Sequence, residues 1–187
     1  MNKTDMRPMA DYDIGFVVLA SMVTITGIFL HVGLLVIMFC SSKLRKPQHF
    51  LVANQSFADL VFLCVSMPLA ITSKILRGWP LDKGSCNIIG MITVMSVHAS
   101  LANIAAVSFN RFLNVSFPLW YINYWTSHST VSLITLVWTY AFLVAAPTQL
   151  GWSAIAFDRR VFACIYDWNK DLGYSHFVLI AGKSGKT

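Results

Sequence analysis

One aspartate inside an otherwise uncharged apolar run is the residue of this sequence best suited to bind an ion. Asp59 lies in the stretch NQSFADLVFLCVSMP, and an ionisable group deep in lipid needs water or a polar partner. Ser100, in a later apolar run, is the partner that we expect, because carboxylate, hydroxyl and water oxygens suit a small hard cation. The alternative is a protonated, hydrogen-bonded aspartate in a protein core, and we favour the functional role.

Two of the four cysteines lie near the edges of apolar runs, where an oxidising compartment would permit a disulfide. Cys86 ends the stretch RGWPLDKGSC and Cys164 lies in RRVFACIYDW, whereas Cys40 and Cys64 fall inside apolar runs. A bridge between Cys86 and Cys164 would tie a loop to the outer end of the third run. Two unrelated free thiols are the alternative.

No group of residues has the spacing of a catalytic or nucleotide-binding site. The histidines are scattered without metal-ligand spacing, and no Ser/His/Asp or paired-carboxylate set converges. They are His31, His49, His98, His128 and His176. The final GKSGKT lacks the first glycine of a phosphate-binding loop, because that position is Ile180. We therefore expect no enzyme, no nucleotide cofactor and no metal beyond a cation at Asp59.

Composition places most of the chain in lipid. Of its 187 residues, 56% are hydrophobic and only 12% are charged, and the net charge of +6 is dispersed in loops, which argues against nucleic-acid binding. A bilayer core requires roughly 20 apolar residues at 1.5 Å rise each. Four runs reach that length, and a fifth, 172–182, is about half as long. The four predicted spans are 14–40, 50–73, 86–110 and 129–157.

The charges of the short connections predict the orientation of these spans. The first connection, SSKLRKPQHF, carries three basic residues, which collect on the cytoplasmic side, so the tail 1–13 is expected outside. The second connection also carries three basic residues and opposes this by count. An outside tail would expose Asn2 as a glycosylation acceptor. Pro68 and Pro147 are expected to kink the second and fourth spans.

Several motifs, taken in chain order, resemble the rhodopsin-like (class A) G-protein-coupled receptors over about residues 14–182. They are NQSFAD with Asp59, GWPLDKGSC with Trp79 and Cys86, FNRFLNVSFPL with Arg111 and Pro118, and the single residues Trp138, Pro147 and Cys164. Cys86 and Arg111 are 25 residues apart, as in the third helix of that family. The resemblance implies an all-α transmembrane fold, the helical bundle of a truncated seven-helix receptor.

The same resemblance implies roles for residues inside the bundle. Asp59 and Ser100 would belong to a sodium-binding pocket that favours the inactive state. Asn54 would form a hydrogen bond with Trp138 and so join neighbouring helices. Cys86 would pair with Cys164 across the outer face. The sodium ion would be the only cofactor, acting as an allosteric modulator.

Residues at both ends of the third helix also receive roles from the resemblance. The switch that would face a heterotrimeric G protein consists of Asn110, Arg111 and Phe112. The third-helix residues that would line the ligand cavity are Thr93, Val94, Val97 and His98. The family implies a multi-pass protein of the plasma membrane, with an extracellular ligand that the sequence does not identify.

Three departures from the family pattern bear on function. Gly33 stands where the first helix usually has an asparagine, which removes one polar link to Asp59. Thr93 stands where receptors for biogenic amines have an aspartate, so an amine ligand is disfavoured. Asn110 replaces the usual acid before Arg111, and a similar Asn-Arg pair occurs in melatonin receptors, which FDRRVFACIYDW also resembles faintly.

The length of the sequence leaves two hypotheses open. The family has seven helices, whereas this sequence carries four spans, part of a fifth and a polar tail, 183–187. We therefore expect an N-terminal portion of a receptor that transduces an extracellular signal, unable to signal alone. The alternative is a genuine short membrane protein that pairs with full-length receptors and retains them. A four-helix channel or scaffold would explain the spans but not the spacing of Trp79, Cys86 and Arg111.

Overall fold

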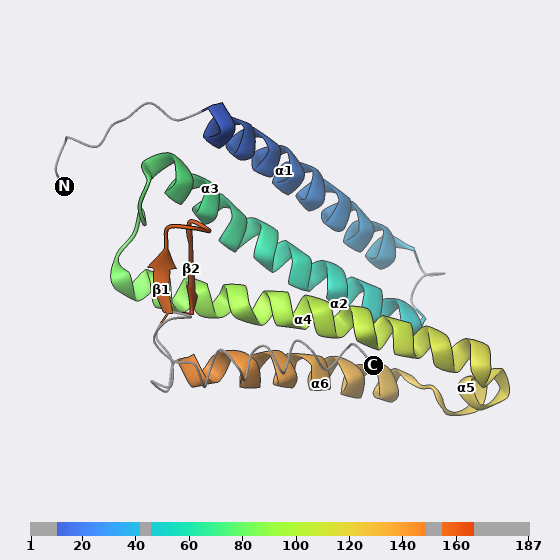
Figure 1. The fold of residues 1–187 in the computed structure, drawn as a ribbon. Coiled ribbons are helices and arrows are strands. Elements are labelled where there is room, and N and C mark those ends of the chain that lie inside the picture. The colour runs from blue at the N-terminus through green and yellow to red at the C-terminus, as the bar shows by residue number, and fades with distance from the viewer. Residues whose placement is uncertain (1–10, 42–45, 149–154, 167–187) are drawn as a thin grey trace, which may run out of the picture.

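Long helices packed side by side make up most of the molecule, with a small β-hairpin at one end (Figure 1). The computed structural model describes residues 11–41, 46–148 and 155–166. The elements in chain order are α1 (Asp11–Cys40), α2 (Pro47–Val61), the π-helical segment η2 (Phe62–Ser66), α3 (Met67–Leu76), α4 (Lys83–Ser116), α5 (Pro118–Tyr124), α6 (Ser127–Ala145), the 3-10 turn η3 (Ala146–Thr148), β1 (Ile155–Asp158) and β2 (Ala163–Tyr166).

Within the described part of the chain, four continuous helical stretches are long and apolar enough to cross a membrane. They are Asp13–Cys40, His49–Leu76, Gly84–Ser116 and Ser127–Ala145. Successive stretches run in opposite directions, as the short connections between them predict (Figure 1). The all-α transmembrane class is confirmed, while Asn2, the partial fifth span 172–182 and the tail 183–187 lie outside the described residues.

The second span changes helix type near its middle. The π-helical segment Phe62–Ser66 separates α2 from α3, and Pro68 lies in the first turn of α3. A proline has no N–H to donate to the preceding turn and its ring crowds the carbonyl four residues earlier. A wider turn before the proline relieves that crowding, since π-helical turns arise as local bulges inside α-helices. The disturbance expected at Pro68 therefore takes the form of a π-helical turn.

The fourth span is shorter than the sequence suggested. The predicted range 129–157 was wrong at its C-terminal end, because α6 stops at Ala145 and the 3-10 turn η3 contains Pro147. Pro147 was expected to kink this helix and instead lies just beyond its end, since it cannot donate the next helical hydrogen bond. At the other end of α6, Thr126 and Ser129 form a reciprocal capping box.

Small side chains allow the central helices to approach closely. A cluster of four alanines and one valine is buried between α2, α4 and α6, and Trp138 packs against it. Small residues at such interfaces let helix backbones come near one another inside a membrane. The members of this cluster are Ala58, Ala99, Ala106, Val137 and Ala141. Helix α4 lies between α2 and α6 and therefore determines where polar groups from its neighbours meet (Figure 1).

Candidate functional site

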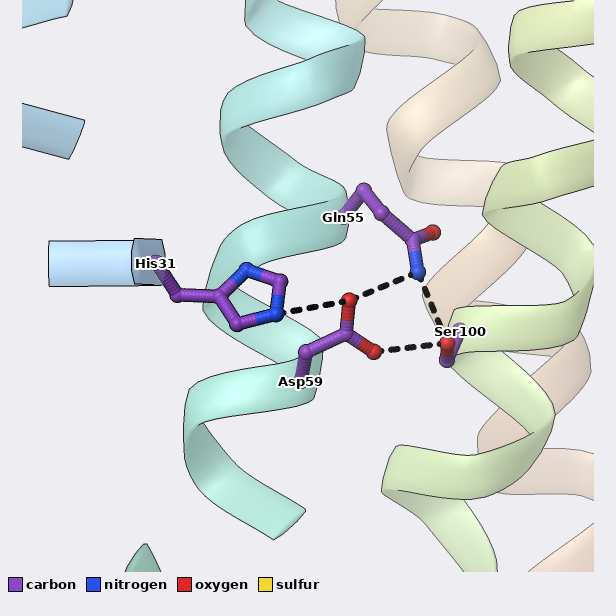
Figure 2. Close-up of polar contacts among 4 residues, drawn as sticks. All are labelled: His31, Gln55, Asp59 and Ser100. Atoms are coloured by element: carbon purple, nitrogen blue, oxygen red, sulfur yellow. Dashed lines mark hydrogen bonds and ion pairs between the residues drawn. The ribbon is translucent and has the colours of Figure 1, made fainter. Parts of the chain in front are cut away.

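Asp59 lies at the meeting point of three helices, and polar atoms from each approach its carboxylate (Figure 2). Ser100 Oγ of α4 donates to Asp59 Oδ1 at 2.7 Å, and Gln55 Nε2 of α2 donates to Oδ2 at 2.9 Å. His31 Nε2 of α1 lies 3.7 Å from the same Oδ2. Asp59 and Ser100 are therefore in contact, as expected. The contacts of Asp59 with Gln55 and His31 were not predicted from the sequence.

A sodium ion does not fit this site as the side chains are arranged. Gln55 Nε2 also donates to Ser100 Oγ at 2.7 Å, so one amide nitrogen lies between the two oxygens that would coordinate the ion. An amide N–H is a donor and cannot bind a cation. Gln55 Oε1, the amide oxygen, is buried and has no hydrogen-bond partner among the described residues. The carboxylate and hydroxyl are thus satisfied within the chain.

A second polar cluster links α2, α4 and α6 through side chains alone. Trp138 Nε1 donates to Asn54 Oδ1 at 2.9 Å, the pair that the resemblance implied. Asn54 Nδ2 in turn donates to Asn103 Oδ1 at 2.7 Å, and Asn103 is fully buried. Sequence reasoning missed Asn103, although it follows Ser100 by three residues and therefore shares its helix face.

At the hairpin end of the bundle, a disulfide fastens the hairpin to α4. Cys86 and Cys164 are bonded, with their Cα atoms 5.5 Å apart, so the predicted bridge is confirmed. The backbone of β2 comes so near α4 that a Cβ added at Gly90 would lie 2.9 Å from the Cys164 carbonyl oxygen. It would also lie 2.5 Å from Ile155 Cγ2, so this close packing requires a glycine. The ring of Trp79 packs against that of Phe157 of β1, with the two ring centroids 6.0 Å apart.

An ion pair joins α1 to α3 at this same end. Lys74 Nζ lies 2.6 Å from Asp13 Oδ1, and both side chains are mostly shielded from solvent. The ammonium also lies 4.3 Å from the centroid of Phe162, between the two strands, and 5.5 Å from that of Phe16. Cations are attracted to ring faces at such distances. In the sequence, Lys74 counts only as one of the three basic residues of the second connection. Its contact with Asp13 was therefore not predicted.

The four residues expected to line a ligand cavity have different surroundings along α4. Thr93 Oγ1 lies 2.6 Å from Ser66 Oγ of η2, while Val94 is buried against α6. His98 Nδ1 lies 2.9 Å from the Val94 carbonyl oxygen, and its ring faces Tyr140 of α6. Val97 is 37% exposed. Their shared role in a cavity stays a prediction.

At the α5 end, Asn110 bonds to a residue other than the neighbouring arginine. Tyr121 of α5 donates its hydroxyl to Asn110 Oδ1 at 2.9 Å, and Asn110 is only 5% exposed. Burial raises the pKa of the Tyr121 phenol. Arg111 is exposed, as is Phe112, which meets Phe117 edge to face.

A hollow of about 240 Å³ lies beside this hydrogen bond, between α2 and α4. Its wall is formed by His49, Val52, Val107, Asn110, Arg111 and Asn114. Arg111 and the two asparagines contribute polar groups to a lining that is otherwise mainly apolar. Two of the three residues expected to form a switch, Asn110 and Arg111, therefore border the same hollow.

The four antiparallel apolar helices, with their buried polar contacts and the disulfide-fastened hairpin, define the class as a multi-pass helical membrane protein. The solved structure of squid rhodopsin has this fold, with a TM-score of 0.80 over 94% of this chain and 48% of that one, at 20% identity. A family model, 7 transmembrane receptor (rhodopsin family), matches residues 32–183. The chain belongs to the rhodopsin family of seven-transmembrane receptors.

Similar proteins include receptors of two kinds. Melatonin receptor type 1B-B of Danio rerio is 30% identical over 87% of this chain, and type 1B-A of the same fish is 27% identical over 88%. G-protein coupled receptor 161 of Xenopus tropicalis is 26% identical over 83%. The matched part spans 48%, 58% and 30% of these three relatives, respectively.

Proposed function

We propose that the chain forms the first part of a receptor that transmits an extracellular ligand signal to a heterotrimeric G protein across the plasma membrane. The hairpin end, with its disulfide, would face the outside, where oxidising conditions preserve such bonds. The α5 end, with Arg111 and the hollow between α2 and α4, would face the cytoplasm. This orientation agrees with the basic connection between the first two spans.

The observation that carries this proposal is the set of bonds along α4. Cys86 near its start is fixed to the hairpin, Ser100 and Asn103 in its middle bind polar side chains of α2, and Asn110 near its end binds α5. A helix of 34 residues is about 50 Å long. One element thus connects a covalently fixed end to an end held by an exchangeable hydrogen bond.

The mechanism would be a shift between two packings of the bundle. A ligand can move such an equilibrium only by binding one packing better than the other. The Trp138–Asn54–Asn103 chain keeps α6, α2 and α4 together, whereas the Tyr121–Asn110 bond can open without loss of the core. Opening it would release α5 from the end of α4 that carries Arg111.

The ligand class is constrained by the surroundings of Thr93. Its hydroxyl is paired with that of Ser66, and neither side chain offers a carboxylate to bind an ammonium group. A ligand without a cationic amine is therefore favoured. Melatonin, which names two of the relatives, is the first compound to test.

The test uses the complete coding transcript of this protein expressed in cells. G-protein dissociation would be measured with and without melatonin and other uncharged compounds, after surface staining has shown that the protein reaches the plasma membrane. Asn110→Asp should lower basal signalling about fivefold, because a carboxylate beside Arg111 adds a charge-assisted restraint of about 1 kcal/mol. A protein that reaches the surface and shows neither basal nor ligand-dependent dissociation would contradict the proposal.

A second candidate function follows from the partial exposure of Asp59. In the described part of the chain its side chain is 24% exposed and that of His31 is 28% exposed. Ionisable groups inside a membrane need shielding from lipid. A helix of a full-length relative packed against this face could shield Asp59 and His31. The chain would then pair with such a receptor and retain it inside the cell. Co-expression should lower the surface amount of the relative, and an unchanged amount would contradict this function.

A further inference from the structure

The bonds around Asp59 form a closed ring. Ser100 donates to one carboxylate oxygen at 2.7 Å, and Gln55 Nε2 donates to the other at 2.9 Å. The second hydrogen of the same amide goes to Ser100 Oγ at 2.7 Å, which closes the ring (Figure 2). Both carboxylate oxygens therefore have a donor, and so does the hydroxyl oxygen.

Helix geometry holds the glutamine in this position. Gln55 precedes Asp59 by four residues, so the two side chains project from the same face of α2. The Gln55 amide therefore donates to the Asp59 carboxylate of the same helix and to the Ser100 hydroxyl of α4. It links the two helices without any group from outside the chain.

The orientation of the amide follows from its partners. If Oε1 and Nε2 were exchanged, the amide oxygen would lie 2.9 Å from a carboxylate oxygen, and both atoms accept hydrogen bonds. The present orientation leaves Oε1 buried without a partner among the described residues. The nitrogen is retained there because it supplies two donors to two oxygens.

We propose that the Gln55 amide takes the place of a metal cation between Asp59 and Ser100, so that the contact of α2 with α4 is independent of sodium. A cation bound to both oxygens would need the position that Nε2 holds. The chain thus carries its own neutral substitute for the ion. Any ligand admitted to this site must first displace the amide.

The experiment measures the thermal unfolding midpoint of the purified chain in lipid nanodiscs. Sodium chloride is compared with choline chloride at equal ionic strength, at about pH 8, where an ordinary histidine is neutral. The unmodified protein should show the same midpoint in both salts. Gln55→Ala should lower the midpoint and gain a sodium-specific rise on the order of 2–4 °C, because the emptied position then offers oxygens to the ion.

Two further variants make the comparison specific. Gln55→Leu removes the donors but keeps the position filled, so it should be destabilised without any response to sodium. In Gln55→Ala, a second change of Asp59→Asn should abolish the sodium response.

A sodium-specific rise in the unmodified protein that Asp59→Asn removes would overturn the proposal, since it would mean that the ion displaces the amide. This outcome depends only on the unmodified chain and Asp59→Asn, so it decides the matter even if the Gln55 variants do not fold. Both results are independent of whether the chain signals to a G protein.

Discussion

The hairpin end and the α5 end of the bundle are held by different kinds of interaction. At the hairpin end, the Cys86–Cys164 disulfide and the short ion pair between Lys74 and Asp13 fix the hairpin and the neighbouring helices. At the α5 end, the Tyr121 hydroxyl of α5 donates the one side-chain hydrogen bond found between α5 and α4 in the described part of the chain. Leu119 and Ile122 of α5 remain 79% and 76% exposed.

This difference indicates where the molecule can change shape. A covalent bond and a shielded ion pair keep one arrangement, whereas a hydrogen bond between neutral groups contributes about 0.5–1.5 kcal/mol and can exchange with water. Regions with few buried contacts open at lower cost than the core. The α5 end is therefore the part of the described bundle that can reorganise while the hairpin end stays fixed.

The largest effect should come from loss of the disulfide. Cys164→Ser is expected to destabilise the protein by about 2–5 kcal/mol, because the bridge closes a long loop in the unfolded chain. The thermal unfolding midpoint in detergent measures this. Cys64→Ser is the matched control, since Cys64 is free and exposed and should change the midpoint little. Equal midpoints for both variants would remove the basis for calling the hairpin end fixed.

A smaller effect is expected from filling the space between α4 and the hairpin. In Gly90→Ala the new methyl would meet Ile155 and the Cys164 carbonyl at under 3.0 Å, so backbone must move, at about 1–3 kcal/mol. Gly33→Ala is the control, because nothing lies within 4 Å of an added Cβ there. Hydrogen exchange at residues 155–166 should increase in Gly90→Ala alone. Unchanged exchange would mean that the hairpin does not rest on the glycine.

A change at the opposite end should affect opening more than stability. Tyr121→Phe removes the bond to Asn110, and the expected loss is about 0.5–1.5 kcal/mol. Faster hydrogen exchange in α5, with the rest of the bundle unaltered, is the expected signature. Tyr124→Phe, at a residue 63% exposed, should leave the exchange rate as it was. A uniform increase throughout the bundle would argue against a separate α5 end.

The smallest effect is expected at the start of α4. Asp82 caps this helix through the backbone N–H groups of Gly84 and Ser85. Its bond with the Ser85 hydroxyl, followed by the backbone bond to Ser85, lowers the pKa of its carboxyl.

Because this pKa is lower in the folded chain than in the unfolded one, the stability gained is present above the ordinary aspartate pKa. It is lost as the pH falls through the lowered value. The small difference in unfolding midpoint between the unmodified protein and Asp82→Asn should therefore shrink in acid. Asparagine keeps a capping oxygen but has no charge to titrate. A difference that grows in acid would contradict this.

The parts of the site visible in the sequence were those with unusual residue types or spacing. Asp59 stands out as the acid of an apolar run, and the two bonded cysteines lie at run edges. Asn54 and Trp138 came from family resemblance. The positions of the spans followed from hydropathy, because a bilayer fixes the length of a helix that crosses it.

The remainder depended on which helix faces meet. Gln55 sits in a polar stretch beside Asn54, and only the packing of α2 on α4 decides that its amide reaches Ser100. Tyr121 lies in a short helix that loop composition did not reveal. The end of α6 was misplaced because the residues after Pro147 are apolar enough to continue a span, and four-residue strands carry too short a pattern to be recognised.

The π-helical segment Phe62–Ser66 has a consequence for the direction of everything that follows it in the second span. An α-helix turns about 100° per residue. A π-helical turn contains one additional residue, so each residue after it points in the direction that the preceding residue would have in an uninterrupted α-helix. Had the helix continued without it, Ser73 would point where Lys74 points now. Asp13 would then face a hydroxyl instead of an ammonium, so the one additional residue sets the angular phase of α3 and thereby the charge that α1 meets.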